Sequence, residues 1–164
     1  MLELDENNIL IDHVITYMYS LLKTNISLLL KDFNIYKNVK DLFINCIKNK
    51  YLKMNNPSTI MMKTVSDCLT IVIVCGVKDH WPTCIEDLIN ESLKENINYC
   101  YTILRALGSI DYIINYNGDI LVGQDYEDSV IISERDKLEI KDKLIENKDL
   151  VINRYKGYNE ICMI

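Results

Sequence analysis

Apolar residues recur three and four positions apart through most of this chain, which is the spacing of one face of an α-helix. In residues 8–23 the recurring positions are Ile11, Val14, Ile15, Met18, Leu21 and Leu22. The same spacing returns over residues 38–51, 57–78, 82–95, 97–107 and 133–156. Residues 25–33 are a shorter apolar piece, either a further helical turn or a packed connector. The pattern therefore predicts an all-α protein with helices over these ranges.

Capping residues, proline and glycine predict where several of these helices begin and end. In Asn55-Asn56-Pro57 an asparagine can cap free amides, and proline suits the first helical position, so a helix is expected to start there. Ser133 is the expected cap of the last helix. Gly108 and Gly157 follow periodic segments and predict two helix ends.

The second half of residues 57–78 is apolar nearly all round, which is typical of a helix covered by its neighbours. The β-branched run Ile71–Val74 would also suit a strand, but the length of the segment and its upstream cap favour a helix. A membrane span needs about 20 apolar residues. Lys63 and Asp67 interrupt this segment, so a buried helix is the better interpretation.

The helices are joined mainly by short links, and those from Pro57 onward fall into pairs of comparable length. This predicts one all-α domain over residues 1–164, built of antiparallel helix pairs stacked as a short α-solenoid. A compact helical bundle would give the same pattern. Residues 117–132 break the periodicity with turn-forming glycines and several acids, so they are predicted to form an acidic loop that docks by its apolar residues.

Charge is unevenly distributed along the chain. The net charge of −6 argues against general binding to nucleic acid or to anionic membranes. Residues 23–53 are rich in lysine, whereas residues 119–139 carry mostly acids. Ordinary solvated surface explains both stretches, and complementary patches for a protein partner are the alternative.

Six cysteines occur without a paired motif or a regular framework. They mostly lie on the apolar side of predicted helices, where cysteine behaves as a small hydrophobic residue. We expect reduced core cysteines, as in a cytosolic or nuclear protein. His13 and His80 have no cysteines at zinc-ligand spacing, so no metal and no cofactor are expected.

The sequence favours a non-enzymatic role. Its five glycines are scattered and form no phosphate-binding loop. Neither histidine has a third group placed to activate a nucleophile. Asp87 and Glu91 share one helical face and could do acid–base chemistry, which would require a pocket that gathers them with His80. The favoured interpretation is that Asp87 and Glu91 are ordinary charged side chains on a solvated surface.

Residues 65–107 carry a family resemblance. Cys68-Leu69 with the apolar run to Val74, then Trp81 followed by Ile-Glu-Asp-Leu-Ile at 85–89, then the leucines of 103–107, resemble the third and fourth HEAT repeats of importin-β-superfamily transport receptors. The most similar branch is that of transportin-3 and importin-13. A charged helix after a long loop, here residues 133–156, follows in the same order.

The sequence also departs from this family. The usual leucine-proline-glutamate end of the leucine-rich helix is replaced by Gly-Ser-Ile-Asp at 108–111. The family's first repeat has no counterpart here, and its chains are several times longer. A fragment or a strongly reduced relative of a longer helical-repeat protein is therefore expected.

The resemblance implies the N-terminal part of a nuclear import receptor that acts in the cytoplasm and nucleus by protein binding. The implied partners are the small GTPase Ran in its GTP form and protein cargo, such as Arg-Ser-rich splicing factors, with no direct nucleic-acid or membrane contact. In such folds the second helix of each pair lines the concave face. The polar sides of those helices give five candidate partner-binding residues: Lys40, Lys48, Asp87, Glu91 and Lys141. A small helical interaction protein, for example a host-modulating one unrelated to transport, is the alternative function.

Overall fold

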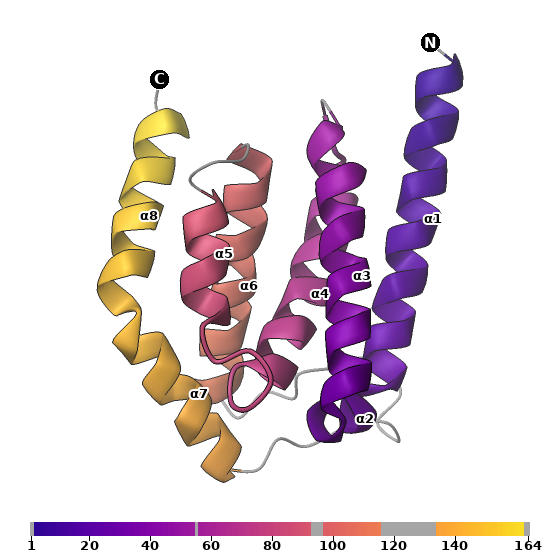
Figure 1. Ribbon diagram of the computed structural model, residues 1–164. Helices are drawn as coiled ribbons and strands as arrows, with labels where there is room; N and C mark the ends of the chain where they lie inside the picture. The colour runs from indigo at the N-terminus through magenta and orange to yellow at the C-terminus, as the bar shows by residue number, and fades with distance from the viewer. Residues whose placement is uncertain (1, 55, 93–96, 116–133, 163–164) are drawn as a thin grey trace.

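The computed structural model describes residues 2–54, 56–92, 97–115 and 134–162, and these residues form helices and no strand (Figure 1). The all-α prediction is confirmed. The predicted acidic loop at 117–132 lies outside the described residues. The elements are α1 (Leu2–Thr24), α2 (Ile26–Lys31), α3 (Phe33–Asn49), a 3-10 turn (Tyr51–Lys53), α4 (Thr59–Gly76), α5 (Cys84–Ser92), α6 (Ile97–Asn115), α7 (Glu134–Glu146) and α8 (Lys148–Cys162).

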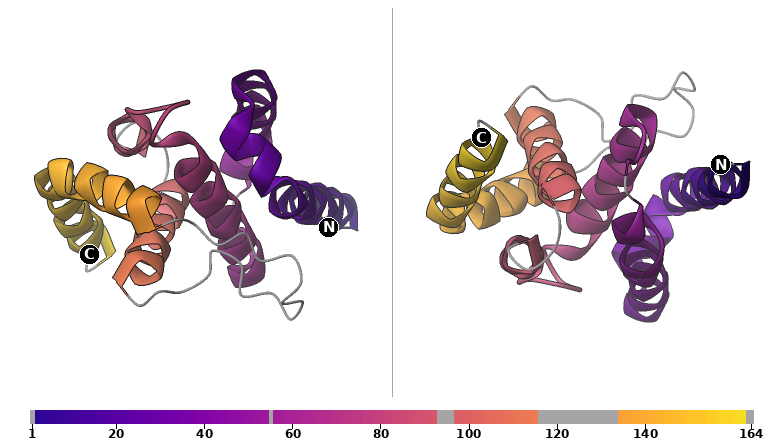
Figure 2. Two further views of the ribbon diagram at one scale, coloured as in Figure 1. Left: turned by 90° about the horizontal axis from the view of Figure 1, so that it is seen from below. Right: turned by 90° about the horizontal axis from the view of Figure 1, so that it is seen from above.

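The helices are arranged in two rows (Figure 2). The first row holds α1, α4 and α6, with α4 packed between the other two. The second row holds α3 and α5, which are joined by an ion pair between Lys48 and Glu91. Helices α7 and α8 lie at the end of the rows, where α8 contacts both α5 and α6. Helix α4 thus lies at the centre, and earlier and later helices of the chain stack on either side of it, as in a solenoid.

Helix α4 is the core of the protein. From Ser66 onward nearly every one of its side chains is buried, including the β-branched run Ile71–Val74, which is helical as predicted. By length and composition alone α4 could cross a membrane, but 67% of it is buried inside the protein, as in the core helix of a packed domain. The helix begins at Thr59 and its cap is Ser58, whose side chain accepts a hydrogen bond from the Met61 amide. The expected asparagine cap at 55–56 was therefore wrong.

Other helix boundaries also differ from the predicted ones. Helix α3 begins at Phe33, because Asp32 caps it by accepting a hydrogen bond from the amide of Ile35 at 3.0 Å. Helix α5 begins at Cys84, after a turn in which the Cys84 amide donates to the carbonyl of Trp81. Helix α6 passes through Gly108 and ends at Asn115.

The last predicted helix is divided into α7 and α8 at Asn147. The side-chain amide of Asn147 donates to the carbonyl of Lys143 at 2.9 Å, the same carbonyl that its backbone amide reaches at 3.3 Å. Such side-chain competition for a backbone acceptor is typical of asparagine at helix interruptions. Helix α8 then continues through Gly157 to Cys162, so neither predicted glycine stop ends a helix.

Four cysteines, Cys68, Cys75, Cys84 and Cys100, are free and buried, whereas Cys46 is partly exposed. Their place in the core confirms the prediction for these residues. Burial raises the thiol pKa of Cys75 and of Cys84 to about 12. A thiolate is the reactive form of cysteine. Both thiols are therefore protected from reagents, because they are buried and because they stay protonated.

This shielding predicts slow reaction with thiol reagents. At pH 8, well below the raised pKa values, Cys75 and Cys84 should remain unlabelled in the folded protein while the partly exposed Cys46 reacts. Peptide mapping after a timed pulse of iodoacetamide measures this, and a urea-unfolded sample in which all sites react is the control. Rapid labelling of Cys75 or Cys84 in the folded protein would contradict the packing described here.

Candidate interaction surface

Four of the five residues predicted to bind a partner lie together across α3 and α5. Lys48 on α3 and Glu91 on α5 form an ion pair at 2.9 Å, with side chains that are 41% and 37% exposed. Lys40 and Asp87 lie on the same two helices, next to Trp81 in the connection that precedes α5. We call the group formed by Lys40, Lys48, Trp81, Asp87 and Glu91 the α3–α5 surface.

Trp81 organises one end of the α3–α5 surface. Its indole N–H donates to the Asp87 carboxylate at 2.6 Å, and the Thr83 hydroxyl donates to the same oxygen at 2.8 Å. The ammonium of Lys40 lies 4.7 Å from the centroid of the Trp81 ring, within the range of a cation–π contact, and also pairs with Asp41. Trp81 is partly buried and packs against the core. Its position therefore fits a role in packing between the helices.

The carboxylate of Glu91 closes the other end of this surface. Besides Lys48 it is approached by the hydroxyl of the buried Tyr99, 3.5 Å away. Asp87 and Glu91, two of the three carboxylates of α5, are thus held by donors that lie outside this helix. The result is a preorganised strip of mixed charge, which suits specificity in protein binding more than affinity.

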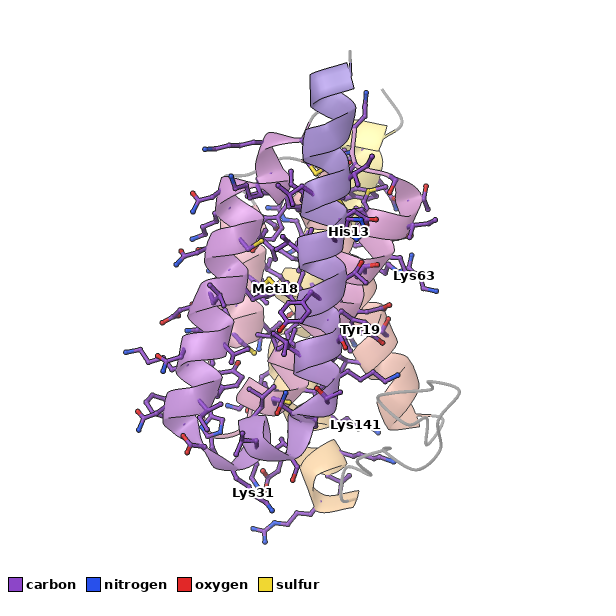
Figure 3. The ribbon with its side chains drawn as sticks, turned by 90° about the vertical axis from the view of Figure 1, so that its right-hand side faces the viewer. His13, Met18, Tyr19, Lys31, Lys63 and Lys141 are labelled. Carbon is purple, nitrogen blue, oxygen red and sulfur yellow. The ribbon has the colours of Figure 1, made fainter. Side chains whose placement is uncertain are left out.

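Lys141 does not join the other four residues. It is exposed on α7 and, within the described part of the chain, no hydrogen bond or ion pair links it to the α3–α5 surface (Figure 3). The structure therefore brings together four of the five sequence-predicted positions. Whether any of them contacts a partner stays a prediction.

His80 lies apart from Asp87 and Glu91. Its Nε2 is 3.1 Å from the carbonyl oxygen of Leu30, and its ring stacks on Tyr36 with centroids 5.0 Å apart. It joins the α4–α5 connection to α2 and α3, as expected of a structural histidine. Asp87, Glu91 and His80 do not share a pocket.

The sequence pattern did not predict a groove that lies between α6 and the α7–α8 segment. The groove has a volume of about 570 Å³, and it is lined by Tyr101, Leu104, Arg105, Leu107, Gly108, Leu144, Lys148, Val151, Ile152, Tyr155 and Tyr158. We call it the α6–α8 groove. Tyr101, Leu104, Arg105 and Gly108 recur at i, i+3, i+4 and i+7, so they lie along one side of α6. The opposite wall comes from the distant α7–α8 segment, and local periodicity does not predict where that segment packs.

No protein-family model matches this chain, and comparisons with curated proteins and with solved structures give no match.

The Lys48–Glu91 ion pair joins α3 and α5, and its contribution to the free energy of unfolding can be measured directly. Because both side chains are partly exposed, a coupling energy of about 0.2–1 kcal/mol is expected from a double-mutant cycle with Lys48→Ala and Glu91→Ala. The coupling should fall in 1 M NaCl, where exposed charges are screened. Urea unfolding of the four proteins measures it, and a zero coupling at low salt would mean that the pair does not form in solution.

Proposed function

We propose that this protein acts by binding a partner protein, as a short stack of HEAT-type helix pairs related to the N-terminal part of nuclear import receptors. The observation that supports this proposal is the progressive two-row stacking, in which α4 packs between α1 and α6 in the first row and α8 contacts both α6 and α5 at the end of the rows. The resemblance over residues 65–107 assigns these helices to consecutive repeats in the same order. Transport between cytoplasm and nucleus is the process in which such a module would act.

The partner proposed first is the small GTPase Ran in its GTP form, with protein cargo, such as Arg-Ser-rich splicing factors, as a second ligand class. The α3–α5 surface supports a protein ligand because its charged groups are held in fixed positions before binding. A partner that meets fixed charges loses little side-chain freedom on docking. Lys141 on α7 lies apart from this surface, so the proposed contact does not include it.

A pull-down with the folded chain tests the proposed partner. Ran loaded with GTP should be retained, and Ran loaded with GDP should not. Equal retention of both forms, or of neither, would remove Ran as the partner and leave the alternative of a helical interaction protein unrelated to transport.

A charge exchange identifies the surface. The double variant Lys48→Glu/Glu91→Lys keeps an ion pair between α3 and α5 while it reverses the charges that a partner meets. It should retain the stability of the parent protein and lose most of the binding. Lys63→Glu is the matched control, since Lys63 is exposed on the first-row helix α4 (Figure 3). Unchanged binding by the double variant would place the contact elsewhere.

A further inference from the structure

The two ends of the helix stack carry unlike apolar surfaces. One is a stripe on α1 that comprises Leu10, Val14, Tyr17 and Leu21, which are 63%, 41%, 65% and 41% exposed. Their spacing of i, i+4, i+7 and i+11 places them along one side of the helix. The side that carries Ile15, Met18 and Leu22 is buried, so α1 has a second apolar side with no helix packed on it among the described residues. Figure 3 views the molecule with α1 in front.

The α6–α8 groove lies at the opposite end. On α6, the groove side carries Tyr101, Leu104 and Arg105, whereas Ile103 and Ala106 on the other side are buried in the core. The lining of this groove is mostly apolar, as in many binding grooves. Among the described residues only α7 and α8 line this side of α6, so the groove is open to another helix.

The stripe and the groove match in length. Leu10 to Leu21 spans about 16 Å at the rise of an α-helix, and the groove wall on α8 from Lys148 to Tyr158 spans about 15 Å. The stripe repeats at the spacing with which one helix inserts side chains between those of another. Within the chain, the first row already packs α1 against α4 and α4 against α6.

The two ends also match in charge. The charged residues that line the groove are both positive, Arg105 and Lys148. The first 22 residues of the chain contain no lysine or arginine and four acids, Glu3, Asp5, Glu6 and Asp12. An acidic apolar helix is the partner that such a groove favours, because opposite charges at the rim raise the encounter rate and select the partner.

We propose that the α6–α8 groove of one molecule binds helix α1 of a second copy of this chain. The contact is head-to-tail, since it joins two different surfaces. Such heterologous contacts build open chains, or rings where the rotation closes. This inference does not depend on the proposed partner protein, because it uses neither the α3–α5 surface nor the resemblance.

The test uses two blocking variants. Tyr17→Glu places a charge in the middle of the exposed stripe. Gly108→Glu places one in the groove, at a position where an added Cβ meets no atom within 4 Å. The matched controls are Ser20→Glu, on the polar side of α1, and Gly157→Glu, which also has open space but does not line the groove.

Sedimentation velocity over a concentration series gives the outcome. The parent chain and both controls should increase in mass with concentration beyond twice the 19.2 kDa of the single chain. Tyr17→Glu and Gly108→Glu should each remain at 19.2 kDa, and circular dichroism should show both to be folded. Their equimolar mixture should form a dimer and nothing larger, because one variant keeps its groove and the other keeps its α1.

Three results would overturn the proposal. The parent chain could remain a monomer across the concentration series, which would mean that the stripe and the groove do not join two copies of this chain. Both blocked variants could still associate, which would place the contact elsewhere. The mixture could remain at the single-chain mass while the parent associates, which would mean that the stripe and the groove do not bind each other.

Discussion

Gly76→Ala is expected to destabilise this protein by about 1–3 kcal/mol, although glycine to alanine in a helix interior ordinarily stabilises by up to about 1 kcal/mol. Gly76 is the last residue of α4, and a Cβ there would overlap the hydroxyl and Cζ of Tyr36. Tyr36 cannot retreat easily. It is 2% exposed, it stacks on His80, and its hydroxyl donates to the carbonyl of Val72 at 2.8 Å.

The sign of the change in the free energy of unfolding decides whether Tyr36 packs against Gly76. Gly108→Ala is the matched control, because Gly108 also lies inside a helix but has open space around it, so the usual stabilisation of roughly 0.5–1 kcal/mol is expected there. Urea unfolding of both variants measures the difference. In a Tyr36→Leu background the cost of Gly76→Ala should largely disappear. A stabilising Gly76→Ala in the parent protein would mean that Tyr36 does not lie against α4.

This contact also illustrates what the sequence could and could not predict. Periodicity found the helices because each helix must bury one apolar side whatever it packs against. The reason for glycine at position 76 is a tyrosine forty residues earlier, and no local pattern carries that information. The same is true of the ion pair between Lys48 and Glu91, although both residues were chosen as candidates from their helix faces.

Helix boundaries were predicted less well because several residues compete to form each cap. Ser58 and Asp32 make the side-chain hydrogen bonds that begin α4 and α3, and neither was chosen from the sequence. The glycines at 108 and 157 lie in ordinary helical surroundings with open space, so nothing forces the chain to turn there. The α6–α8 groove was missed for another reason: its α6 wall lies within residues 101–108, and its other wall comes from the distant α7–α8 segment.

The two candidate surfaces therefore differ in how they could be found. The α3–α5 surface consists of polar residues on helices that were correctly identified, and the structure supplied the bonds that fix them. The groove exists only because α7 and α8 lie beside residues 101–108 of α6. Surfaces that depend on the relative placement of distant helices are seen only once the fold is known.

Helix α3 gives the second large prediction. Leu42 and Phe43 are adjacent apolar residues in this helix, but Phe43 is fully buried whereas Leu42 is 63% exposed. Neighbouring residues on a helix point about 100° apart, so only one of them can face α4 and the core. Phe43→Ala should therefore cost about 3–5 kcal/mol, which is a large part of the stability of a domain of this size.

Leu42→Ala is the control for this prediction, and it should change the free energy of unfolding by less than about 0.5 kcal/mol. If Phe43→Ala does not fold, the milder Phe43→Leu preserves the test. It conserves most of the buried apolar volume and should cost about 1–2 kcal/mol, still more than the control. Urea unfolding of the three variants gives the order. Equal losses at positions 42 and 43 would mean that α3 is rotated about its axis, and Lys40 and Lys48 could then not both face α5.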